Sequence, residues 1–288
     1  IFVVFVKINV LDFIYVTNYP LCMIKKVSSH ENSVRRRFDD FKSAYDQSWD
    51  SKNHTLHVGI FPNRQTTLTE GFQFATQYLE RLCKPISSYS HILDVCAGTG
   101  RTLLEFTAKY GCQGTGIDIS PKQIQDAQQH NNGKCTFICH SASDIGDIIE
   151  KDKFSHVISQ DGIFLVEDKQ GCLDNIYTAL KPGGKLVIAD FLIQDPTLKD
   201  CHDVTKTIPW QNGFSFDAYK MALKKSGFSI IHAEQRPQDI IRNYELLATQ
   251  ASEFLPDNTM KQLVNRYQQI VESAKRGTMS WGWFVCHK

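Results

Sequence analysis

Residues 91–100, His-Ile-Leu-Asp-Val-Cys-Ala-Gly-Thr-Gly, constrain the fold of this chain more than any other stretch. Residues 92–95 predict a short buried strand, residues 97–100 a tight turn, and residues 101–110 a helix. A strand that runs through a glycine turn into a helix presents backbone N–H groups at the positive end of the helix dipole. Glycine also lets a ligand approach the backbone without a Cβ in the way. The stretch therefore predicts a nucleotide-type cofactor site, while a plain tight turn and a dinucleotide site remain as alternatives.

Strands and helices alternate from this stretch to residue 190. Repeated βα units imply a parallel sheet with helices on both faces and right-handed crossovers. Ligands of such sheets bind beyond the carboxyl ends of the strands. The expected strands are 91–95, 114–119, 135–140, 154–159 and 185–190, and the expected helices are 101–110, 121–130, 144–150 and 170–180.

The segments before residue 91 and after residue 190 are also predicted to contain helices. Residues 31–50 carry aromatic side chains at helical spacing, which predicts a lid helix that packs onto the domain. After residue 190 the chain is irregular up to residue 213. We find no repeat and no low-complexity linker, so residues 25–288 are expected to form one domain. The remaining expected elements are helices 69–82, 215–226 and 237–276, the last broken near Pro256, and strands 228–234 and 278–287.

Residues 1–24 form an atypical apolar extension. Two β-branched runs are interrupted by Lys7, Asn9 and Asp12, so the segment is too short and too charged for a membrane span. It also lacks the basic start and small-residue cleavage site of a secretory signal. We therefore expect no stable membrane insertion. Because Met23 opens an ordinary polar N-terminus, our hypothesis is that it is the natural start.

The composition limits which classes of binding partner are expected. A formal net charge of +1 gives no global field that favours nucleic acid or an acidic membrane, and Arg35-Arg36-Arg37 is expected to be a solvated helix face. Nine cysteines are scattered without a Cys-x-x-Cys pair. Cys135, Cys139 and His140 lie close in sequence but lack a second ligand pair for zinc. The sequence thus predicts no metal, reduced thiols and a cytoplasmic location.

Polar side chains follow three of the expected strands. Asp118 ends the second strand, where its carboxylate can accept hydrogen bonds from both hydroxyls of a ribose. Asp144 follows the third strand, where it could accept from an adenine amino group or simply occupy the first turn of a helix. Residues 159–161, Ser-Gln-Asp, end the fourth strand at the mouth of the sheet. Polar residues in these positions are typical of a ligand site.

Three motifs together resemble class I S-adenosylmethionine-dependent methyltransferases. They are Leu-Asp-Val-Cys-Ala-Gly-Thr-Gly at 93–100, Gly-Ile-Asp-Ile-Ser at 116–120 and Leu-Lys-Pro-Gly-Gly-Lys-Leu at 180–186. The resemblance implies an α/β, Rossmann-like, doubly wound sheet of seven strands with an antiparallel last strand, and S-adenosylmethionine as cofactor. By position it implies Ala97, Gly98 and Gly100 around the methionine part, Asp118 at the ribose, Ser143 and Asp144 at the adenine, Ser159 and Gln160 under the methionine, and Asp94 and Ile119 as further cofactor-binding residues.

A closer similarity points to amine substrates. Residues 56–61, Leu-His-Val-Gly-Ile-Phe, residues 159–161 and the terminal Trp-Gly-Trp-Phe at 281–284 look similar to sarcosine and dimethylglycine N-methyltransferases, with phosphoethanolamine N-methyltransferases as neighbours. Those enzymes carry Ser-Gln-Asp-x-Phe-Leu-His. Here the stretch 159–166 is one residue longer and has Val166 in place of the histidine. The departure concerns the acceptor pocket and not the cofactor pocket.

The chemistry of methyl transfer to an amine suggests further residues. The amine must be neutral to attack, so a base is needed, and His57 and Asp161 are the candidates. A satisfied loop histidine is an equally good interpretation of His57. Aromatic faces favour the cationic donor and a methylated ammonium product. Tyr45, Trp49, Trp210 and Trp281 could form such a cage, of which we expect one or two to touch the ligand.

Other functions remain as alternatives. An O- or C-methyltransferase of a natural product or lipid headgroup would use the same cofactor site. A non-catalytic methyltransferase-like subunit would be expected to carry a damaged cofactor loop, yet Gly98, Gly100 and Asp118 are all present. A nicotinamide dehydrogenase is disfavoured because Leu103 stands where the third small residue of its loop is needed. A nucleic-acid or protein substrate is disfavoured by the lack of a basic stripe.

Overall fold

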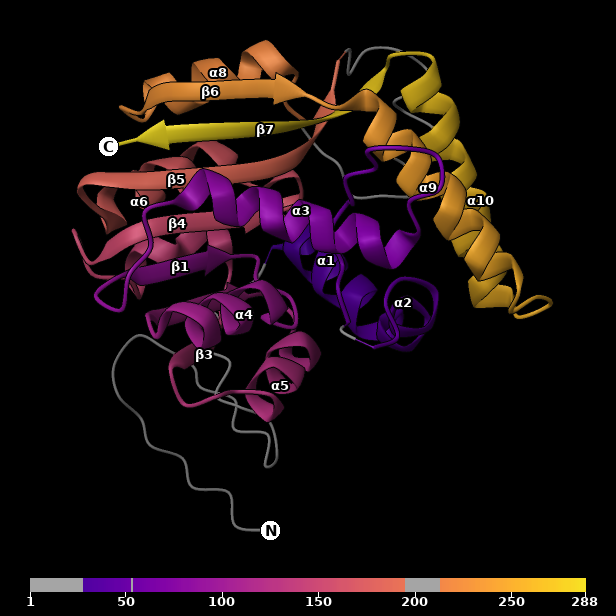
Figure 1. Cartoon of the computed structure of the whole chain (residues 1–288), viewed down its shortest axis with the longest axis horizontal. Coiled ribbons are helices and arrows are strands. Elements are labelled where there is room, and N and C mark those ends of the chain that lie inside the picture. Colours follow the sequence, from indigo (N-terminus) through magenta and orange to yellow (C-terminus); the bar gives the residue numbers. More distant parts are fainter. Residues whose placement is uncertain (1–27, 53, 195–212) are drawn as a thin grey trace, which may run out of the picture.

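A seven-stranded sheet forms the centre of the computed structural model, which describes residues 28–52, 54–194 and 213–288 (Figure 1). The strand order is β3-β2-β1-β4-β5-β7-β6, and β7 is antiparallel to both of its neighbours while the other pairs are parallel. The predicted doubly wound sheet with an antiparallel last strand is confirmed. The strands are β1 (His91–Val95), β2 (Gln113–Asp118), β3 (Cys135–Cys139), β4 (Phe154–Gln160), β5 (Leu180–Ile193), β6 (Ser229–Gln235) and β7 (Met279–His287).

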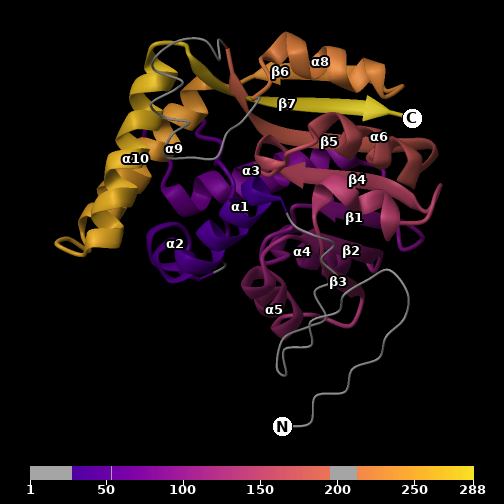
Figure 2. The same ribbon diagram turned by 180° about the vertical axis from the view of Figure 1, so that it is seen from behind.

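Helices cover both faces of the sheet, each over its own apolar core. Figure 1 shows α3 and α4 on one face, and Figure 2 shows α6 on the other. The first core includes Phe72, Leu103 and Ile124, and the second includes Leu173 and Tyr219. The helices are α1 (Ser29–Asp40), α2 (Lys42–Ser48), α3 (Leu68–Cys83), α4 (Arg101–Tyr110), α5 (Pro121–Gln129), α6 (Lys169–Ala179), α8 (Phe216–Lys225), α9 (Pro237–Ser252) and α10 (Asn258–Lys275), with short 3-10 turns at Ala142–Asp147 and Ile163–Leu165.

Local sequence signals explain where several of these helices begin and end. The Ser120 side chain accepts a hydrogen bond from the Gln123 N–H, and Pro121 occupies the first turn of α5. Thr67 and Glu70 form a reciprocal capping box at the start of α3. Gly111 ends α4 in the left-handed conformation. These signals are local, which is why the sequence predicts these boundaries.

Some elements differ from their expected form. The lid helix expected over 31–50 is two helices, α1 and α2, because the backbone breaks at Phe41. The helix expected over 144–150 is a 3-10 turn, in which Asp144 has non-helical backbone angles. The helical region 237–276 is α9 and α10, broken near Pro256 as predicted. The extension 1–24, the Met23 hypothesis and Trp210 lie outside the described residues.

Four helices gather at one end of the sheet. In Figures 1 and 2, α1, α2 and the α9–α10 pair lie beside the end where β1 and β4 finish. Tertiary contacts join α1 to α5, α2 to α9, and α10 to β7. Within the described ranges, no helix combines the length and the apolar character that crossing a bilayer requires. The fold thus places a helical cover over the carboxyl ends of the parallel strands.

Candidate functional site

A pocket with an empty volume of about 750 Å³, part of it open to solvent, lies under this helical cover. Its walls come from the carboxyl ends of β1, β2, β3 and β4 and from the facing side of α1. This is where a parallel sheet of this topology is expected to bind a ligand. The lining includes Glu31, Val34, Phe38, Leu56, Cys96, Gly98, Ile117, Asp118, Ile119, Gln123, His140, Ser141, Ala142, Gln160, Asp161, Gly162, Leu165 and Val166.

The glycine loop leaves open space at the centre of the pocket. Gly98 and Gly100 have φ angles of +53° and +70°, a region that favours glycine. A Cβ on Gly98 would meet no atom within 4 Å, so a ligand can approach this backbone directly. A Cβ on Gly100 would lie 2.4 Å from the Phe137 ring, so this glycine serves packing. The two glycines therefore have different roles.

Asp118 is fixed at the end of β2 by two backbone donors. Gly98 N–H donates to Oδ2 at 2.9 Å, and Ser120 N–H donates to Oδ1 at 2.8 Å. Burial raises the pKa of Asp118 to about 6, against the lowering effect of these hydrogen bonds. At neutral pH the group is thus mainly ionised, and it ties the glycine loop to the second strand. A carboxylate held in this way can accept two hydroxyl groups of a ligand.

Two amide side chains in the lining have buried atoms without partners. The Gln160 Oε1 accepts from the Thr102 hydroxyl at 2.9 Å, but its Nε2 has no hydrogen bond. Both amide atoms of Gln123 are unpaired, although that residue is only 1% exposed. Buried polar groups normally have hydrogen-bond partners. These unpaired amide atoms therefore fit a site in which a polar ligand provides the missing partners.

Asp161 follows β4 with a φ of +56°, a conformation that is uncommon outside glycine. Its Oδ2 accepts from Val58 N–H and its Oδ1 from the Trp281 indole Nε1–H, each at 2.6 Å. Burial raises the pKa of Asp161 to about 7, and the two hydrogen bonds only partly offset this. The group can therefore exchange a proton near neutral pH.

The loop over residues 56–61 owes its position to three side chains. Besides the bond from Val58 to Asp161, Gly59 N–H donates to Asn243 Oδ1 at 3.0 Å, and Phe61 N–H donates to Asp239 Oδ1 at 2.7 Å. Both acceptors belong to α9. The motif at 56–61 thus joins the fourth strand to the helical cover.

A second pocket, with an empty volume of about 560 Å³, adjoins the first. Asp161 lines both pockets, together with Phe38, Leu56 and Leu165, so these residues stand where the pockets meet. Aromatic rings make up most of the second lining, together with two guanidinium groups. Its residues are Arg37, Phe38, Tyr45, Trp49, Leu56, Asp161, Phe164, Leu165, Phe191, Tyr244, Arg266, Tyr267 and Ile270.

The expected site residues divide into three groups. Gly98, Asp118, Ile119, Gln160 and Asp161 line the first pocket, and Tyr45 and Trp49 line the second. Trp210 lies outside the described residues. The predicted residues that are absent from both linings are Asp94, Ala97, Gly100, Ser143, Asp144, Ser159, His57 and Trp281.

His57 and Trp281 need correction. His57 Nε2 pairs with the Thr76 hydroxyl at 3.2 Å, and its ring packs edge-on against Phe72. Burial lowers its pKa to about 4, so His57 is the satisfied loop histidine and a poor base. Trp281 is fully buried in β7 and reaches the site only through Asp161. Its ring is therefore absent from the aromatic lining of the second pocket, and its indole N–H holds the Asp161 carboxylate.

Two other predicted residues, Ser159 and Asp94, are buried in the strands next to the pocket and do not line it. Ser159 is buried, and its hydroxyl donates to the Val95 carbonyl at 2.8 Å, which joins β4 to β1. Asp94 is 5% exposed, and burial first, then the nearby charge of Asp118, raises its pKa well above the usual range. Among the described residues six cysteines are free, but Cys139 is disulfide-bonded, so the expectation of reduced thiols is wrong at that position.

Several pocket residues did not emerge from the sequence. Glu31 and Gln123 were missed in the first pocket, and Arg37, Tyr244 and Arg266 in the second. Gln123 could have been found, because the first turn after the Asp118 strand faces the same edge of the sheet. The others come from the helical cover, whose docking no local signal predicts.

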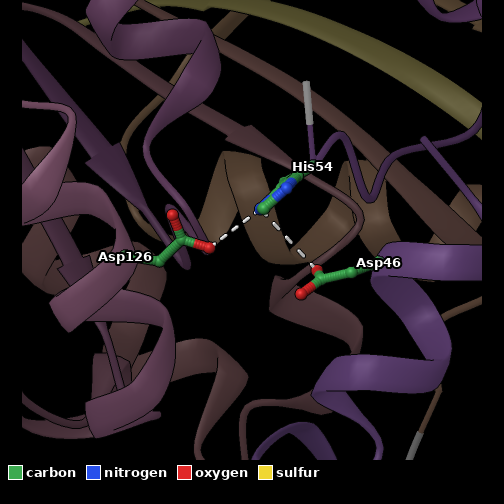
Figure 3. A group of neighbouring side chains, drawn as sticks. All are labelled: Asp46, His54 and Asp126. Atoms are coloured by element: carbon green, nitrogen blue, oxygen red, sulfur yellow. Dashed lines mark hydrogen bonds and ion pairs between the residues drawn. The ribbon is translucent and has the colours of Figure 1, made fainter. Parts of the chain in front are cut away.

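Figure 3 shows a group of Asp46, His54 and Asp126, which joins α2 to α5 near the glycine loop. Its oxygens and ring nitrogen lie close enough to hold a metal ion. However, the Lys42 ammonium donates to Asp126 at 2.6 Å and to Asp46 at 2.8 Å, and His54 Nδ1 lies 3.0 Å from Asp126. An ammonium therefore already supplies the positive charge, and we describe the group as an ion-pair network.

Replacing Asp126 by asparagine is expected to lower the free energy of unfolding by about 1–2 kcal/mol at pH 7, because two charged hydrogen bonds are lost. Burial raises the pKa of Asp126, but the bonds from Lys42 and His54 outweigh it and hold the pKa below 3.8. The contribution is thus present above pH 3.8 and is lost as pH falls through the lowered value. Urea unfolding of the two proteins, with Asp40→Asn as an exposed control on the same cover, measures it. Equal stability at pH 7 would contradict the network.

The comparisons with known proteins agree with this geometry. A protein-family model described as a methyltransferase domain matches residues 92–184. Phosphoethanolamine N-methyltransferase 1 of Zea mays is 26% identical over 231 residues, which cover 76% of this chain and 45% of that protein. An O-methyltransferase of Pyrenophora dematioidea is 29% identical over 201 residues, covering 64% of this chain and 72% of that protein. The chain spans about half the length of the plant relatives that it matches.

Solved structures show the same fold. A putative sarcosine dimethylglycine methyltransferase from Galdieria sulphuraria superposes with a TM-score of 0.79 at 21% identity, covering 87% of this chain and 98% of that one. Phosphoethanolamine N-methyltransferase 2 of Haemonchus contortus, in complex with phosphomonomethylethanolamine and S-adenosylhomocysteine, gives 0.76 at 21% identity, covering 92% and 61%. At this identity the likeness concerns the fold alone.

Proposed function

Because the chain contains a class I S-adenosylmethionine-dependent methyltransferase domain, we propose that it transfers a methyl group from this cofactor to the nitrogen of a small-molecule amine. S-adenosylmethionine is the cofactor, and the first pocket has the glycine loop, the fixed carboxylate and the unpaired amide groups to hold it. The observation that carries the proposal is the position of Asp161, which lines both the cofactor pocket and the aromatic pocket.

When bound, S-adenosylmethionine supplies a methyl group already activated on a sulfonium. The protein then has to orient the acceptor, exclude water and remove a proton. In our proposal, the open backbone at Gly98 and the Asp118 carboxylate orient the cofactor. The aromatic walls of the second pocket exclude water from the acceptor.

Asp161 is proposed as the base. An acceptor ammonium transfers a proton to a carboxylate oxygen of Asp161, which leaves a neutral nitrogen lone pair to attack the methyl carbon. A pKa of about 7 suits this role, because a general base works best near the operating pH. The two N–H donors occupy only part of the acceptor capacity of the carboxylate.

The second pocket favours an amine that also carries an anionic group. Tyr45, Trp49 and Tyr244 can face a cationic nitrogen, and Arg37 and Arg266 place guanidinium groups in the same wall. Arg37 Nε donates to the Tyr45 hydroxyl at 3.2 Å, which orients that guanidinium. Guanidinium groups recognise carboxylate and phosphate. The Zea mays and Galdieria sulphuraria proteins, named for phosphoethanolamine and for sarcosine and dimethylglycine, support this class.

An O-methyltransferase is the second candidate, supported by the Pyrenophora dematioidea relative. A carboxylate at the junction of the pockets can deprotonate a hydroxyl group as well as an ammonium. The second pocket would then hold an aromatic alcohol through ring contacts. The two candidates differ in the atom that receives the methyl group.

An acceptor panel distinguishes these candidates. The panel pairs phosphoethanolamine with ethanolamine, and dimethylglycine with trimethylamine, and adds simple phenols, each incubated with S-adenosylmethionine. Mass spectrometry reads the product. We expect methylation of an amine with an anionic group and at least tenfold less of its partner that lacks the anionic group. Methylation of the phenols alone would replace the N-methyltransferase with the O-methyltransferase.

Replacing Trp281 by phenylalanine is expected to shift the pH dependence of the rate. The change removes the indole donor to Asp161, and since that bond lowers the pKa of Asp161, the pKa rises. The rise in rate near pH 7 then moves to higher pH by about 0.5–1 unit. Trp283 is a matched control, because it is equally buried in β7 and its Nε1 has no partner. A Trp283→Phe shift as large as that of Trp281→Phe would refute the role of the indole bond.

Three further predictions remain proposals. We propose that residues 25–288 act as one domain, supported by β7 completing the sheet that begins at β1. We also propose a cytoplasmic location, which the six free cysteines of the described ranges support and the disulfide at Cys139 opposes. A small molecule, and not nucleic acid, is the proposed substrate because the second pocket is lined mainly by aromatic rings and the chain has a net charge of only +1.

A further inference from the structure

The order of strands along the cofactor pocket indicates which end of the pocket would hold the adenine of the cofactor. The pocket runs from Gln160 at β4, past Gly98 at β1 and Asp118 at β2, to Ser141 beyond β3. If the methionine part lies over Gly98 and the ribose at Asp118, the adenine lies at the β3 end. That end is formed by residues 140–142 and is covered by α1.

Glu31 of α1 reaches this end of the pocket. It is 8% exposed, lines the pocket, and its Oε1 accepts a hydrogen bond from the Ser141 hydroxyl. The Ser141 oxygen in turn accepts from Ser143 N–H at 3.1 Å, which orients the hydroxyl. A carboxylate has more acceptor sites than this one bond uses. Burying a carboxylate costs free energy unless hydrogen-bond donors satisfy it. The position of Glu31 therefore fits a second donor at this end of the pocket.

Neighbouring contacts hold α1 in place over the pocket. His30 Nε2 pairs with the Leu165 carbonyl at 2.8 Å, and the Ser120 hydroxyl donates to Asp39 at 2.6 Å. These bonds attach α1 to the loop after β4 and to the start of α5. Glu31 lies between them, so its carboxylate is positioned by a fixed helix and not by a free loop.

We propose that Glu31 accepts a hydrogen bond from the exocyclic amino group of the cofactor adenine and so selects adenine over other bases. The acceptor then comes from the helical cover, and not from Asp144, whose side chain is absent from the pocket lining. The buried amide of Gln123, with both atoms unpaired, supplies a second polar contact on the same wall. This inference rests on the cofactor and not on the identity of the acceptor.

Binding of two product analogues tests the proposal without any turnover. S-adenosylhomocysteine carries the amino group, and S-inosylhomocysteine carries a carbonyl oxygen in its place. Calorimetry of the wild-type protein is expected to show at least tenfold tighter binding of the adenine compound. In Glu31→Gln, the side-chain amide can donate to the carbonyl oxygen, so the ratio of the two affinities is expected to fall by about tenfold or more.

A merely structural Glu31 gives a different result. If the residue only fastens α1 to Ser141, Glu31→Gln weakens both analogues equally and the ratio is unchanged, which would overturn the proposal. Asp144→Asn is the matched control, expected to leave the ratio within about twofold. A ratio that changes in Asp144→Asn but not in Glu31→Gln would return the role to Asp144. Failure of the wild-type protein to bind S-adenosylhomocysteine would instead contradict the cofactor pocket itself.

Discussion

Replacing Asp161 by asparagine is expected to lower kcat by about 10²- to 10⁴-fold, the usual contribution of a positioned base. The carboxylate lies where the two pockets meet, and asparagine keeps its size but loses the proton acceptor. Asparagine also leaves Val58 N–H or the Trp281 indole without its acceptor. Thermal unfolding is therefore measured alongside, so that a loss of folded protein is not mistaken for a loss of chemistry.

The pH dependence makes this prediction specific. The ionised carboxylate is the active form, and its pKa is about 7, so the wild-type rate should rise as pH increases through 7. Glu or Asp bases in solution titrate well below this value. The Asp161→Asn variant should lack this rise and keep only the one at higher pH that belongs to the free amine. A variant with more than a third of the wild-type kcat and the same pH profile would exclude Asp161 as the base.

Replacing Asp118 by alanine is expected to weaken binding of S-adenosylhomocysteine by about 10- to 100-fold. Loss of charged hydrogen bonds to a ribose costs about 1–3 kcal/mol. The change also removes the acceptor for Gly98 N–H and Ser120 N–H, so the glycine loop loses its tie to β2. The lost hydrogen bonds to the ribose and the loosened glycine loop both weaken binding of S-adenosylhomocysteine.

Calorimetry on the folded variant measures this loss. Asp217→Ala, which removes a carboxylate that is 81% exposed on α8, is the matched control and should bind as the wild-type protein does. Unchanged affinity in Asp118→Ala would disprove the ribose assignment.

The position of the glycine loop and of Asp118 at one pocket could be predicted because the signals for them are local. Gly98 and Gly100 mark a turn between a buried strand and a helix, and Asp118 ends the next strand at the same edge of a parallel sheet. Strand ends of such a sheet lie together in any fold of this type. No knowledge of distant packing is needed to place these residues.

The second pocket depends on packing between distant segments. Tyr45 lies on α2, about 200 residues before Tyr244 and Arg266 on α9 and α10, and nothing in their local pattern says that they share a pocket. Trp281 looked like a cage residue because aromatic side chains suit cations. Its strand, however, packs against α9 and α10, and the ring is fully buried in the apolar core that also holds Tyr244 and Tyr267.

Glu31 illustrates the same limit. Its helix was expected as a lid, but a helical pattern does not tell which residue of the lid faces the sheet. The sequence predicts Asp144 as the partner for adenine because it follows the third strand. The 3-10 turn at 142–147 leaves Ser141 and Ala142 in the lining, with Asp144 outside it.

The most direct test of the account is methyl transfer from methyl-labelled S-adenosylmethionine to phosphoethanolamine and dimethylglycine, measured by mass together with the S-adenosylhomocysteine formed. The account predicts label on the nitrogen of one of these amines, with one S-adenosylhomocysteine for each methyl group transferred. Tight binding of S-adenosylhomocysteine without transfer to any amine would contradict the proposed N-methyltransferase while leaving the fold and the cofactor pocket in place.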